Sequence, residues 1–267
     1  MRFEKWHGIG NAYLLVEQSQ LPLQPTAARV QRICHADLGA GGDGLLLIGQ
    51  GDAGRPRVRI FNPDGGEAEF SGNGTRIAAG YLMERDGIDA LQMDTIKGTI
   101  GAHRHDGVIT IDAGRASLQS ADHAPDGGPP PSAHYTFVSI GNPHCVIEVD
   151  DPDRLDLAAL GSPIEHHHWF PNRTNVEFYR PLSQHDIRMR VWERGAGETL
   201  SSGSGSSAAA VAAVVNGRAS SPVTVHLDGG DLTVEVSPEL DVRLTGPVEP
   251  ILRGSFDAAF MRVLEQL

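Results

Sequence analysis

Two serines, Ser71 and Ser202, occupy matching places in two glycine-rich segments of the chain. Residues 66–74 read GEAEFSGNG and residues 197–205 read GETLSSGSG. When the segments and the residues that follow them are superimposed at an offset of 131 positions (202 − 71), identical Gly, Glu and Ala residues coincide. The pattern indicates two copies of one unit, each with a hydroxyl at the start of a helix. Such a pair of hydroxyls suits chemistry on both faces of one small molecule.

Each Ser-Gly-X-Gly loop is expected to lead directly into a helix. Unpaired backbone N–H groups and the positive end of the helix dipole converge at such a point, and glycine lets the backbone approach a ligand closely. A single loop of this kind is more simply a glycine turn with a serine N-cap. Two loops at matching positions are hard to explain by local capping alone, so each is a candidate cradle for a carboxylate or a phosphate.

Further polar residues are expected at strand ends rather than on strand faces. They are Asn11, Asn62, Asn142, His144, Asn175, Glu193 and Arg194. Each asparagine by itself indicates a turn, His144 is equally a structural histidine, and Glu193 with Arg194 is equally a surface ion pair. An acid next to a base near a helix N-terminus also suits the binding of an amino acid zwitterion. Together these groups favour a small, polar ligand with several charges.

The size and charge of the chain limit the function classes. Its 267 residues are natural for two domains of roughly 130 residues, and 40% hydrophobic with 21% charged residues is typical of a soluble globular protein. The net charge is −12 and Lys and Arg are scattered, which argues against nucleic-acid binding. No apolar run approaches the ~20 residues that span a membrane, and the N-terminus lacks a secretory apolar core. We therefore expect a cytoplasmic protein that binds no membrane.

The cysteines and a histidine cluster give weaker signals. Cys34 lies in a helix-like run and Cys145 in a strand-like run, so each is expected to be a small buried hydrophobe. A cytoplasmic location argues against a disulfide between them. Residues 166–168 are three histidines, and because adjacent side chains point in different directions, a solvated loop is favoured over a metal site. We expect no bound metal.

Apolar periodicity and turn residues predict a similar order of elements in both halves. In the first half, strands are expected at both ends of 3–17 and over 45–48, 58–61, 91–96, 99–103 and 108–111, with helices over 26–36 and from after Gly74 to about 85. In the second half, strands are expected over 135–140, 146–149, 175–179, 187–192, 223–227, 232–236 and 242–244, with helices over 155–160 and 206–215. Residues 121–133 are rich in Pro and Gly and are typical of a linker or surface loop.

This order of elements predicts an α+β fold with two pseudo-symmetric domains. Each domain is expected to be a mixed β-sheet wrapped around a central α-helix. We place the first domain at residues 1–116 plus 250–267 and the second at residues 117–249.

A set of short segments follows a recognisable order along the chain. The segments are HGIGN at 7–11, GGDG at 41–44, FNPDG at 61–65, SGNG at 71–74, GNPH at 141–144, TNV at 174–176, ERG at 193–195 and TLSSGSG at 199–205. With these segments the chain resembles the diaminopimelate epimerase family, pyridoxal-independent enzymes that invert one α-carbon in lysine and cell-wall biosynthesis. The resemblance extends over nearly the whole length.

The resemblance implies a fold of two pseudo-symmetric halves with the active site in the cleft between them. The residues that match the family's substrate-binding groups are Asn11, Asn62, Asn142, Asn175, Glu193 and Arg194, and the helix N-terminal amides of Gly72, Asn73, Gly203 and Ser204 would bind the substrate α-carboxylate. In the family, one cysteine removes the α-proton as a thiolate and a second cysteine returns a proton to the opposite face. The resemblance further implies an amino acid substrate, no cofactor and a homodimer.

The chain departs from the family at the two cysteine positions, which are Ser71 and Ser202. A thiol has a pKa of about 8.5 and can become a thiolate near neutral pH. An alcohol is a far weaker acid, each further pKa unit costs about 1.4 kcal/mol, and serine is normally activated by a neighbouring base. Ala12 and Gly44 also stand where many relatives carry Asp or Gln, which indicates altered contacts to the distal end of the substrate.

Three functions remain open at this point. The favoured hypothesis is an isomerase of this family that inverts the α-carbon of LL-diaminopimelate, with Ser71 and Ser202 as the catalytic residues. His144 or Glu193 would then serve as an auxiliary base. The second hypothesis is a catalytically silent protein that binds the same ligand in the absence of both cysteines. The third is a relative that acts on another amino acid or carboxylate by isomerisation or elimination.

Overall fold

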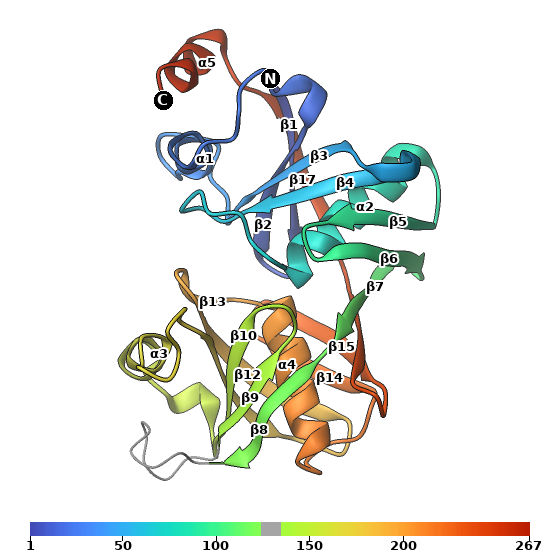
Figure 1. Cartoon of the computed structure of the whole chain (residues 1–267), viewed down its shortest axis with the longest axis vertical. Coiled ribbons are helices and arrows are strands. Elements are labelled where there is room, and N and C mark those ends of the chain that lie inside the picture. The colour runs from blue at the N-terminus through green and yellow to red at the C-terminus, as the bar shows by residue number, and fades with distance from the viewer. Residues whose placement is uncertain (124–134) are drawn as a thin grey trace. The chain divides into compact units, whose positions relative to one another are not determined.

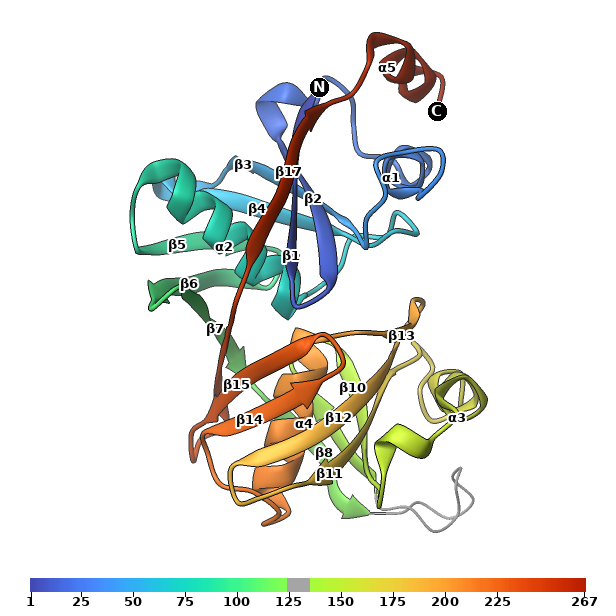
Figure 2. The same ribbon diagram turned by 180° about the vertical axis from the view of Figure 1, so that it is seen from behind.

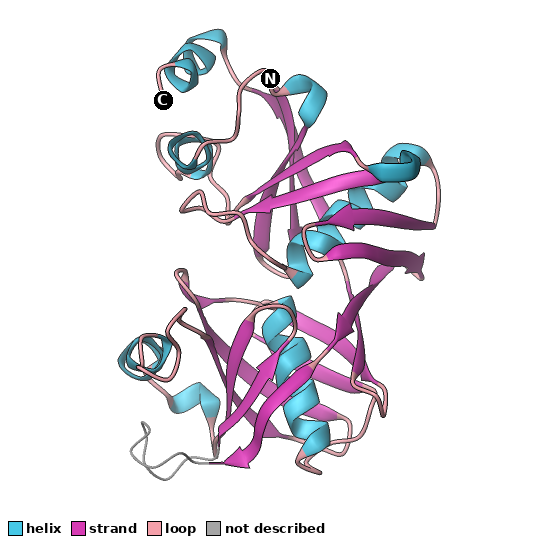
Figure 3. Cartoon of the chain, viewed as in Figure 1, coloured by secondary structure: helices cyan, strands magenta, loops and turns pink. Residues whose placement is uncertain are grey.

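The computed structural model describes residues 1–123 and 135–267 (Figure 1). The chain divides into two compact units, residues 1–111 with 247–267, and residues 112–246. Each unit combines a mixed sheet with a long helix that runs among its strands (Figure 3). The predicted α+β class and the predicted pair of similar units are confirmed.

The first unit consists of one mixed sheet and its helices. Its strands are β1 (Arg2–Gly8), β2 (Asn11–Glu17), β3 (Leu45–Gln50), β4 (Pro56–Phe61), β5 (Ala90–Thr95), β6 (Gly98–His105), β7 (Val108–Arg115), whose last residues fall in the second unit, and β17 (Glu249–Ser255). Its helices are α1 (Ala27–Cys34), α2 (Gly72–Asp86) and α5 (Ala258–Glu265), with 3-10 turns at Gln18–Gln20 and Asp52–Gly54. The strand order is β17–β1–β2–β3–β4–β5–β6–β7, parallel at β2–β3 and β4–β5. Figure 2 shows β17 beside β1.

Helix α2 forms the centre of the first unit. Its residues Ile77, Leu82 and Met83 are fully buried, and a helix that is buried on all sides lies in a core rather than on a surface. The helix begins after the N-cap Ser71, slightly earlier than predicted, and ends at Gly87, whose φ of 66° is the left-handed conformation that favours glycine. The end predicted from the sequence is therefore confirmed.

The opposite face of the same sheet is covered by α1 and α5. Leu14 and Val16 of β2 pack there with Val30 and Ile33 of α1 and with residues of α5. Because side chains alternate along a strand, Tyr13 points to the other face, where its hydroxyl reaches the first turn of α2. The alternation thus decides which residues of β2 belong to the core and which reach the loop.

The second unit repeats the design of the first. Its strands are β8 (Ser117–His123), β9 (Tyr135–Ser139), β10 (Pro143–Glu148), β11 (Asn175–Pro181), β12 (Asp186–Glu193), β13 (Gly197–Thr199), β14 (Val223–Leu227), β15 (Gly230–Val236) and β16 (Asp241–Gly246). Its helices are α3 (Leu157–Glu165) and α4 (Gly203–Val215), with a 3-10 turn at Pro152–Arg154. The strand order is β8–β9–β10–β11–β12–β14–β15–β16, parallel at β10–β11 and β12–β14, and β13 pairs with β12.

The two units share one series of strand pairs. From β1 to β7 the pairs are antiparallel, parallel, antiparallel, parallel, antiparallel and antiparallel. The strands from β9 to β16, without β13, follow the same series. An offset of 131 positions (203 − 72) places α2 on α4 and brings α1 onto α3. The internal repeat seen in the loops therefore extends through the whole fold.

Two predictions about local structure were wrong. The segment 121–133 was expected to be a loop, but residues up to His123 belong to β8, which pairs with β9. This strand is rich in polar residues, so its apolar pattern did not reveal it; residues 124–133 of the predicted loop lie outside the described residues. His144 was expected to precede the strand predicted over 146–149, but it lies within β10, paired with Asn175 of β11.

Other elements were missed or too short. The sequence pattern did not reveal β13, β17 or α5, because these depend on pairing or packing with distant segments. Helix α3 was expected to end at 160 and continues to Glu165, with Pro163 inside it. Helix α4 begins at Gly203 rather than at 206, immediately after its N-cap Ser202.

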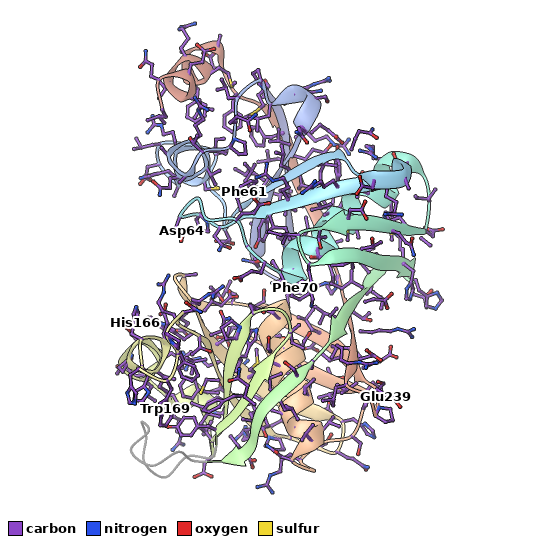
Figure 4. All side chains as sticks on the ribbon, viewed as in Figure 1. Phe61, Asp64, Phe70, His166, Trp169 and Glu239 are labelled. Atoms are coloured by element: carbon purple, nitrogen blue, oxygen red, sulfur yellow. The ribbon has the colours of Figure 1, made fainter. Side chains whose placement is uncertain are left out.

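The cysteines and the histidine cluster agree with the sequence analysis. Cys34 and Cys145 are free and buried. His166 and Trp169 lie at the end of α3 (Figure 4), and the three histidines follow the helix in a turn in which His166 and His168 are exposed. In residues 1–123 and 135–267, no helix has both the length and the apolar composition needed to cross a membrane.

Candidate active site

The first turn of α2 carries the first predicted catalytic residue. Ser71 is the N-cap, and its Oγ accepts a hydrogen bond from the backbone N–H of Gly74 at 3.1 Å. The same Oγ lies 3.1 Å from the Tyr13 hydroxyl, and either oxygen can donate. Gly72 and Asn73, whose amides were predicted to bind a carboxylate, are buried in this turn. The turn therefore combines the N-terminal end of a helix dipole with a pair of hydroxyls.

A buried cation supports this turn from within the helix. The guanidinium of Arg76 is fully buried and donates to Asn73 Oδ1 at 2.8 Å and to the Gly72 carbonyl at 3.4 Å. Burial lowers the pKa of Arg76 to about 9, which leaves it charged at neutral pH. Its charge adds to the helix dipole, so the first turn of α2 is a favourable place for an anion.

The first turn of α4 carries the second predicted catalytic residue. Ser202 is the N-cap, and its Oγ accepts from the Gly205 N–H at 3.2 Å. Ser202 also donates to Glu193 Oε2 at 2.9 Å, while Thr199 donates to Glu193 Oε1 at 2.7 Å. An ionised carboxylate only accepts, so the Ser202 proton points at Glu193. This hydroxyl has a base within hydrogen-bond distance.

The electrostatic surroundings tune that base. Burial raises the pKa of Glu193, the hydrogen bonds from Thr199 and Ser202 lower it, and the negative charge of Glu177 raises it. The nearby charge of His144 acts in the lowering direction. The pKa of Glu193 lies above its usual range, which makes it a stronger proton acceptor once it is ionised.

His144 belongs to a separate buried chain of hydrogen bonds. Its Nδ1 lies 2.7 Å from Glu177 Oε1 and its Nε2 lies 3.0 Å from Asn142 Oδ1. Asn142 in turn donates to Ser204 Oγ at 3.4 Å. Both ring nitrogens face oxygen atoms of this chain, so His144 contacts Glu177 and Asn142 rather than Ser202. Its predicted role as an auxiliary base stays a prediction.

Asn175 holds the backbone around the second site. Its amide donates to the Pro143 carbonyl at 2.9 Å, and its Oδ1 accepts from the Arg194 N–H at 2.9 Å. The Arg194 guanidinium donates to the Asn172 carbonyl at 3.4 Å. Asn175 thus ties the start of β11 to the end of β12, beside Glu193.

The strand directions gather the predicted residues within each unit. β10 and β11 are parallel and β12 is antiparallel to them, so the starts of β10 and β11 and the end of β12 lie at one edge. This edge holds Asn142, Asn175 and Glu193. In the first unit, β2, β3 and β4 have the same directions, and the edge holds Asn11 at the start of β2 and Asn62 after β4.

Four residues at these sites were missed by the sequence analysis. They are Tyr13, Arg76, Glu177 and Thr199. One signal for Tyr13 was available, because the offset of 131 positions (144 − 13) places it on His144. Arg76 and Glu177 gave no signal, since their roles depend on burial that a local pattern does not reveal.

Solved structures of other proteins share this fold. The solved structure of a protein from Pseudomonas aeruginosa described as a predicted epimerase superimposes with a TM-score of 0.76 at 18% identity, covering 96% of this chain and 98% of that chain. A hydroxyproline epimerase from Agrobacterium vitis superimposes with a TM-score of 0.73 at 15% identity, covering 95% and 91%. At these identities the likeness shows the fold alone.

Sequence relatives define the family more closely. The family model for diaminopimelate epimerase matches residues 3–119 and 136–250. The diaminopimelate epimerase of Moorella thermoacetica is 42% identical over 279 residues, covering 96% of this chain and 99% of that protein, and that of Desulfitobacterium hafniense is 39% identical with coverage of 95% and 97%. The chain belongs to the diaminopimelate epimerase family.

Proposed function

We propose that the protein is an isomerase that inverts the α-carbon of LL-diaminopimelate to give the meso form, in cytoplasmic lysine biosynthesis and without pyridoxal phosphate. One observation carries the proposal: Ser71 and Ser202 are N-caps of two equivalent buried helices. Family membership over nearly the full length supports the substrate. A net charge of −12 supports a small-molecule partner rather than nucleic acid, and we propose a homodimer that binds no membrane.

The N-termini of α2 and α4 would bind the α-carboxylate of the ligand. The amides of Gly72 and Asn73 and those of Gly203 and Ser204 would bind the α-carboxylate, since helix N-termini favour anions. The polar groups of Asn11, Asn62, Asn142, Asn175 and Arg194 would hold the rest of the reacting end. Ser71 and Ser202 would then address opposite faces of the α-carbon.

Proton removal by serine requires a partner. An alcohol is about as weak an acid as water, so a free alkoxide at pH 7 costs roughly 12 kcal/mol. The contact between Ser202 and Glu193 removes this need. The α-proton passes to Ser202 Oγ while the proton of Ser202 passes to Glu193 Oε2, so the carboxyl group becomes neutral and the negative charge passes to the α-carbon.

A second candidate function is binding without turnover. It is favoured by one specific observation, the presence of hydroxyls at both positions where the resemblance places thiols. A protein with the helix termini intact would keep affinity for a dicarboxylate amino acid. It would not exchange the α-proton, because neither serine would form a sufficiently strong base.

One experiment separates the two functions. The protein is incubated with LL-diaminopimelate or the meso form in deuterated water, and the α-proton is followed by NMR. Exchange with inversion supports the isomerase, and saturable binding without exchange supports the silent binder. Turnover of other amino or carboxylic acids, with none of diaminopimelate, would instead establish the third hypothesis of the sequence analysis.

Restoring the thiols provides the matched control. In the S71C/S202C variant, inversion is expected to rise by orders of magnitude, since a thiolate is accessible near neutral pH. A variant that folds, binds diaminopimelate and shows no gain would mean that the two first turns do not address one α-carbon. That result would overturn the assignment of the serines.

A further inference from the structure

We infer that Tyr13 is the positioning residue that supplies the proton of Ser71, so that the two serines are prepared for opposite steps. Ser202 hydrogen-bonds to a carboxylate, which accepts a proton. Ser71 hydrogen-bonds to a phenol, which holds one. The inference rests on the proposed function, in which both serines act on the substrate α-carbon.

The geometry at Ser71 is built around the phenol. Tyr13 is 4% exposed, and its hydroxyl lies 3.1 Å from Ser71 Oγ. The backbone N–H of Gly74 donates to the same Oγ, also at 3.1 Å. Because Ser71 Oγ accepts from this amide and also contacts the phenol, the serine hydroxyl is held between the first turn of α2 and Tyr13.

Gly44 makes room for the tyrosine ring. A Cβ at this position would lie 2.4 Å from Tyr13 Cε1 and 2.5 Å from the Phe61 carbonyl oxygen. Any side chain at position 44 would therefore displace the ring and its hydroxyl. The position of the Tyr13 ring therefore depends on the glycine at position 44. Position 44 is one at which the resemblance to the family leads us to expect a polar residue.

The internal repeat places Tyr13 of the first unit at the position of a histidine in the second unit. The offset of 131 positions places Tyr13 on His144 (144 − 13), Asn62 on Glu193 (193 − 62) and Leu46 on Glu177 (177 − 46). Leu46 and Glu177 also lie at equivalent places in their units, because Leu46 is close to Gly74 and Glu177 is close to the matching Gly205. Neither carboxylate position of the second unit has a carboxylate in the first. Of these first-unit positions, only Tyr13 carries a titratable group.

The acidities of the two partners set the direction of proton flow. A phenol has a pKa of about 10 and a glutamic acid one of about 4.3. A phenol therefore holds its proton at neutral pH and can supply it, whereas the Glu193 carboxylate accepts the Ser202 hydrogen bond and favours proton acceptance. The resting protein thus holds a base behind Ser202 and an acid behind Ser71.

On one face the C–H bond breaks, the proton joins Ser202 Oγ, and the former Ser202 proton joins Glu193. On the other face the Ser71 O–H bond breaks and its proton joins the α-carbanion, while the Tyr13 proton moves to Ser71 Oγ. Tyr13 is left as a phenolate and Glu193 as a carboxylic acid, and exchange with water restores both. The configuration whose α-proton faces Ser202 is therefore the faster substrate for exchange.

The test uses the ratio of inversion to exchange. Tyr13→Phe and the wild-type protein are compared in deuterated water with LL- and meso-diaminopimelate, and both rates are measured by NMR. Removing the phenol is expected to slow inversion at least tenfold. Exchange of the preferred isomer should fall less than about threefold, because it requires only Ser202 and Glu193. A purely structural defect would lower both rates together, and that result would overturn the relay.

Repeating the Tyr13→Phe comparison in the S71C variant separates loss of the proton donor from a defect in folding. In S71C the thiol ionises by itself, so adding Tyr13→Phe should change inversion by less than about twofold. Equal losses in the serine and cysteine backgrounds would overturn the inference. Incorporation of a ring-fluorinated tyrosine at position 13, which keeps the O–H donor, should restore inversion; failure to restore it would also count against the relay.

Tyr81→Phe is the matched control. It removes the same atom from a tyrosine on α2, whose hydroxyl donates to Glu17 at 2.8 Å and lies near the far end of the helix from Ser71. The ratio of inversion to exchange should remain that of the wild type. If no variant, including S71C, exchanges the α-proton, the proposed function and the relay both fail. If exchange occurs with a loss that is independent of background, the relay alone fails.

Discussion

The first turns of α2 and α4 can be compared residue by residue, because their N-cap serines have nearly the same backbone geometry. Ser71 has φ −138° and ψ 115°, and Ser202 has φ −137° and ψ 119°. In both turns the serine oxygen accepts from the third residue after it. The hydroxyls differ in their other partner, which is the phenol of Tyr13 in one turn and the carboxylate of Glu193 in the other.

In this duplicated fold, the capping geometry is preserved more strictly than the acid–base chemistry. Capping satisfies helix N–H groups that would otherwise be unpaired, and each unit needs it to fold. The partner of the hydroxyl is under no such constraint. A reaction that removes a proton from one face and returns one to the other gains from unequal partners.

The largest expected effect on α-proton exchange comes from removing the Glu193 carboxylate. Glu193→Gln keeps the shape of the side chain but removes the proton acceptor of Ser202. Exchange of the α-proton that faces Ser202 should fall by about 10²–10⁴-fold, measured by NMR in deuterated water. Glu198→Gln serves as the control, since Glu198 pairs with Arg190 instead. Wild-type exchange in Glu193→Gln would contradict the role of this carboxylate.

The next largest expected effect is on the free energy of unfolding, through the buried His144–Glu177 pair of the second unit. His144 and Glu177 are fully buried, whereas the equivalent first-unit residues are Tyr13 and Leu46. Glu177→Leu or His144→Tyr alone should lower the free energy of unfolding by about 3–5 kcal/mol, because each leaves the other member unpaired. The double variant, which copies the first unit, should lose less than the sum of the two. Additive losses in chemical denaturation would contradict the coupling.

Steric pressure on Tyr13 should have a smaller effect. Gly44→Ala would place a methyl group against the Tyr13 ring and the Phe61 carbonyl. We expect a loss of about 1–3 kcal/mol in unfolding free energy, together with a fall in inversion relative to exchange. Gly66→Ala is the control, because its nearest contact is an Asp64 carboxylate oxygen at 3.2 Å in an exposed turn. Equal effects of the two variants would show that Gly44 has no special relation to Tyr13.

The comparison also shows what a sequence can predict here and what it cannot. Both central helices were predictable, because a serine N-cap opens each of them and Gly87 or Gly217 follows its end. The partners of the two serines were not, since Tyr13 and Glu193 come from strands whose registers and directions bring them to the loops. Strand β17 was missed because it exists through pairing with β1, more than 240 positions away in sequence order (249 − 8 = 241).

The smallest expected effect concerns the charge that tunes Glu193. Exchange on the Ser202 side requires ionised Glu193, so its rate should rise with pH and reach a plateau above the pKa of that group. The negative charge of Glu177 raises this pKa. Glu177→Gln should therefore move the midpoint of the pH–rate profile to lower pH. A midpoint that moves to higher pH would show that another group controls exchange on this side.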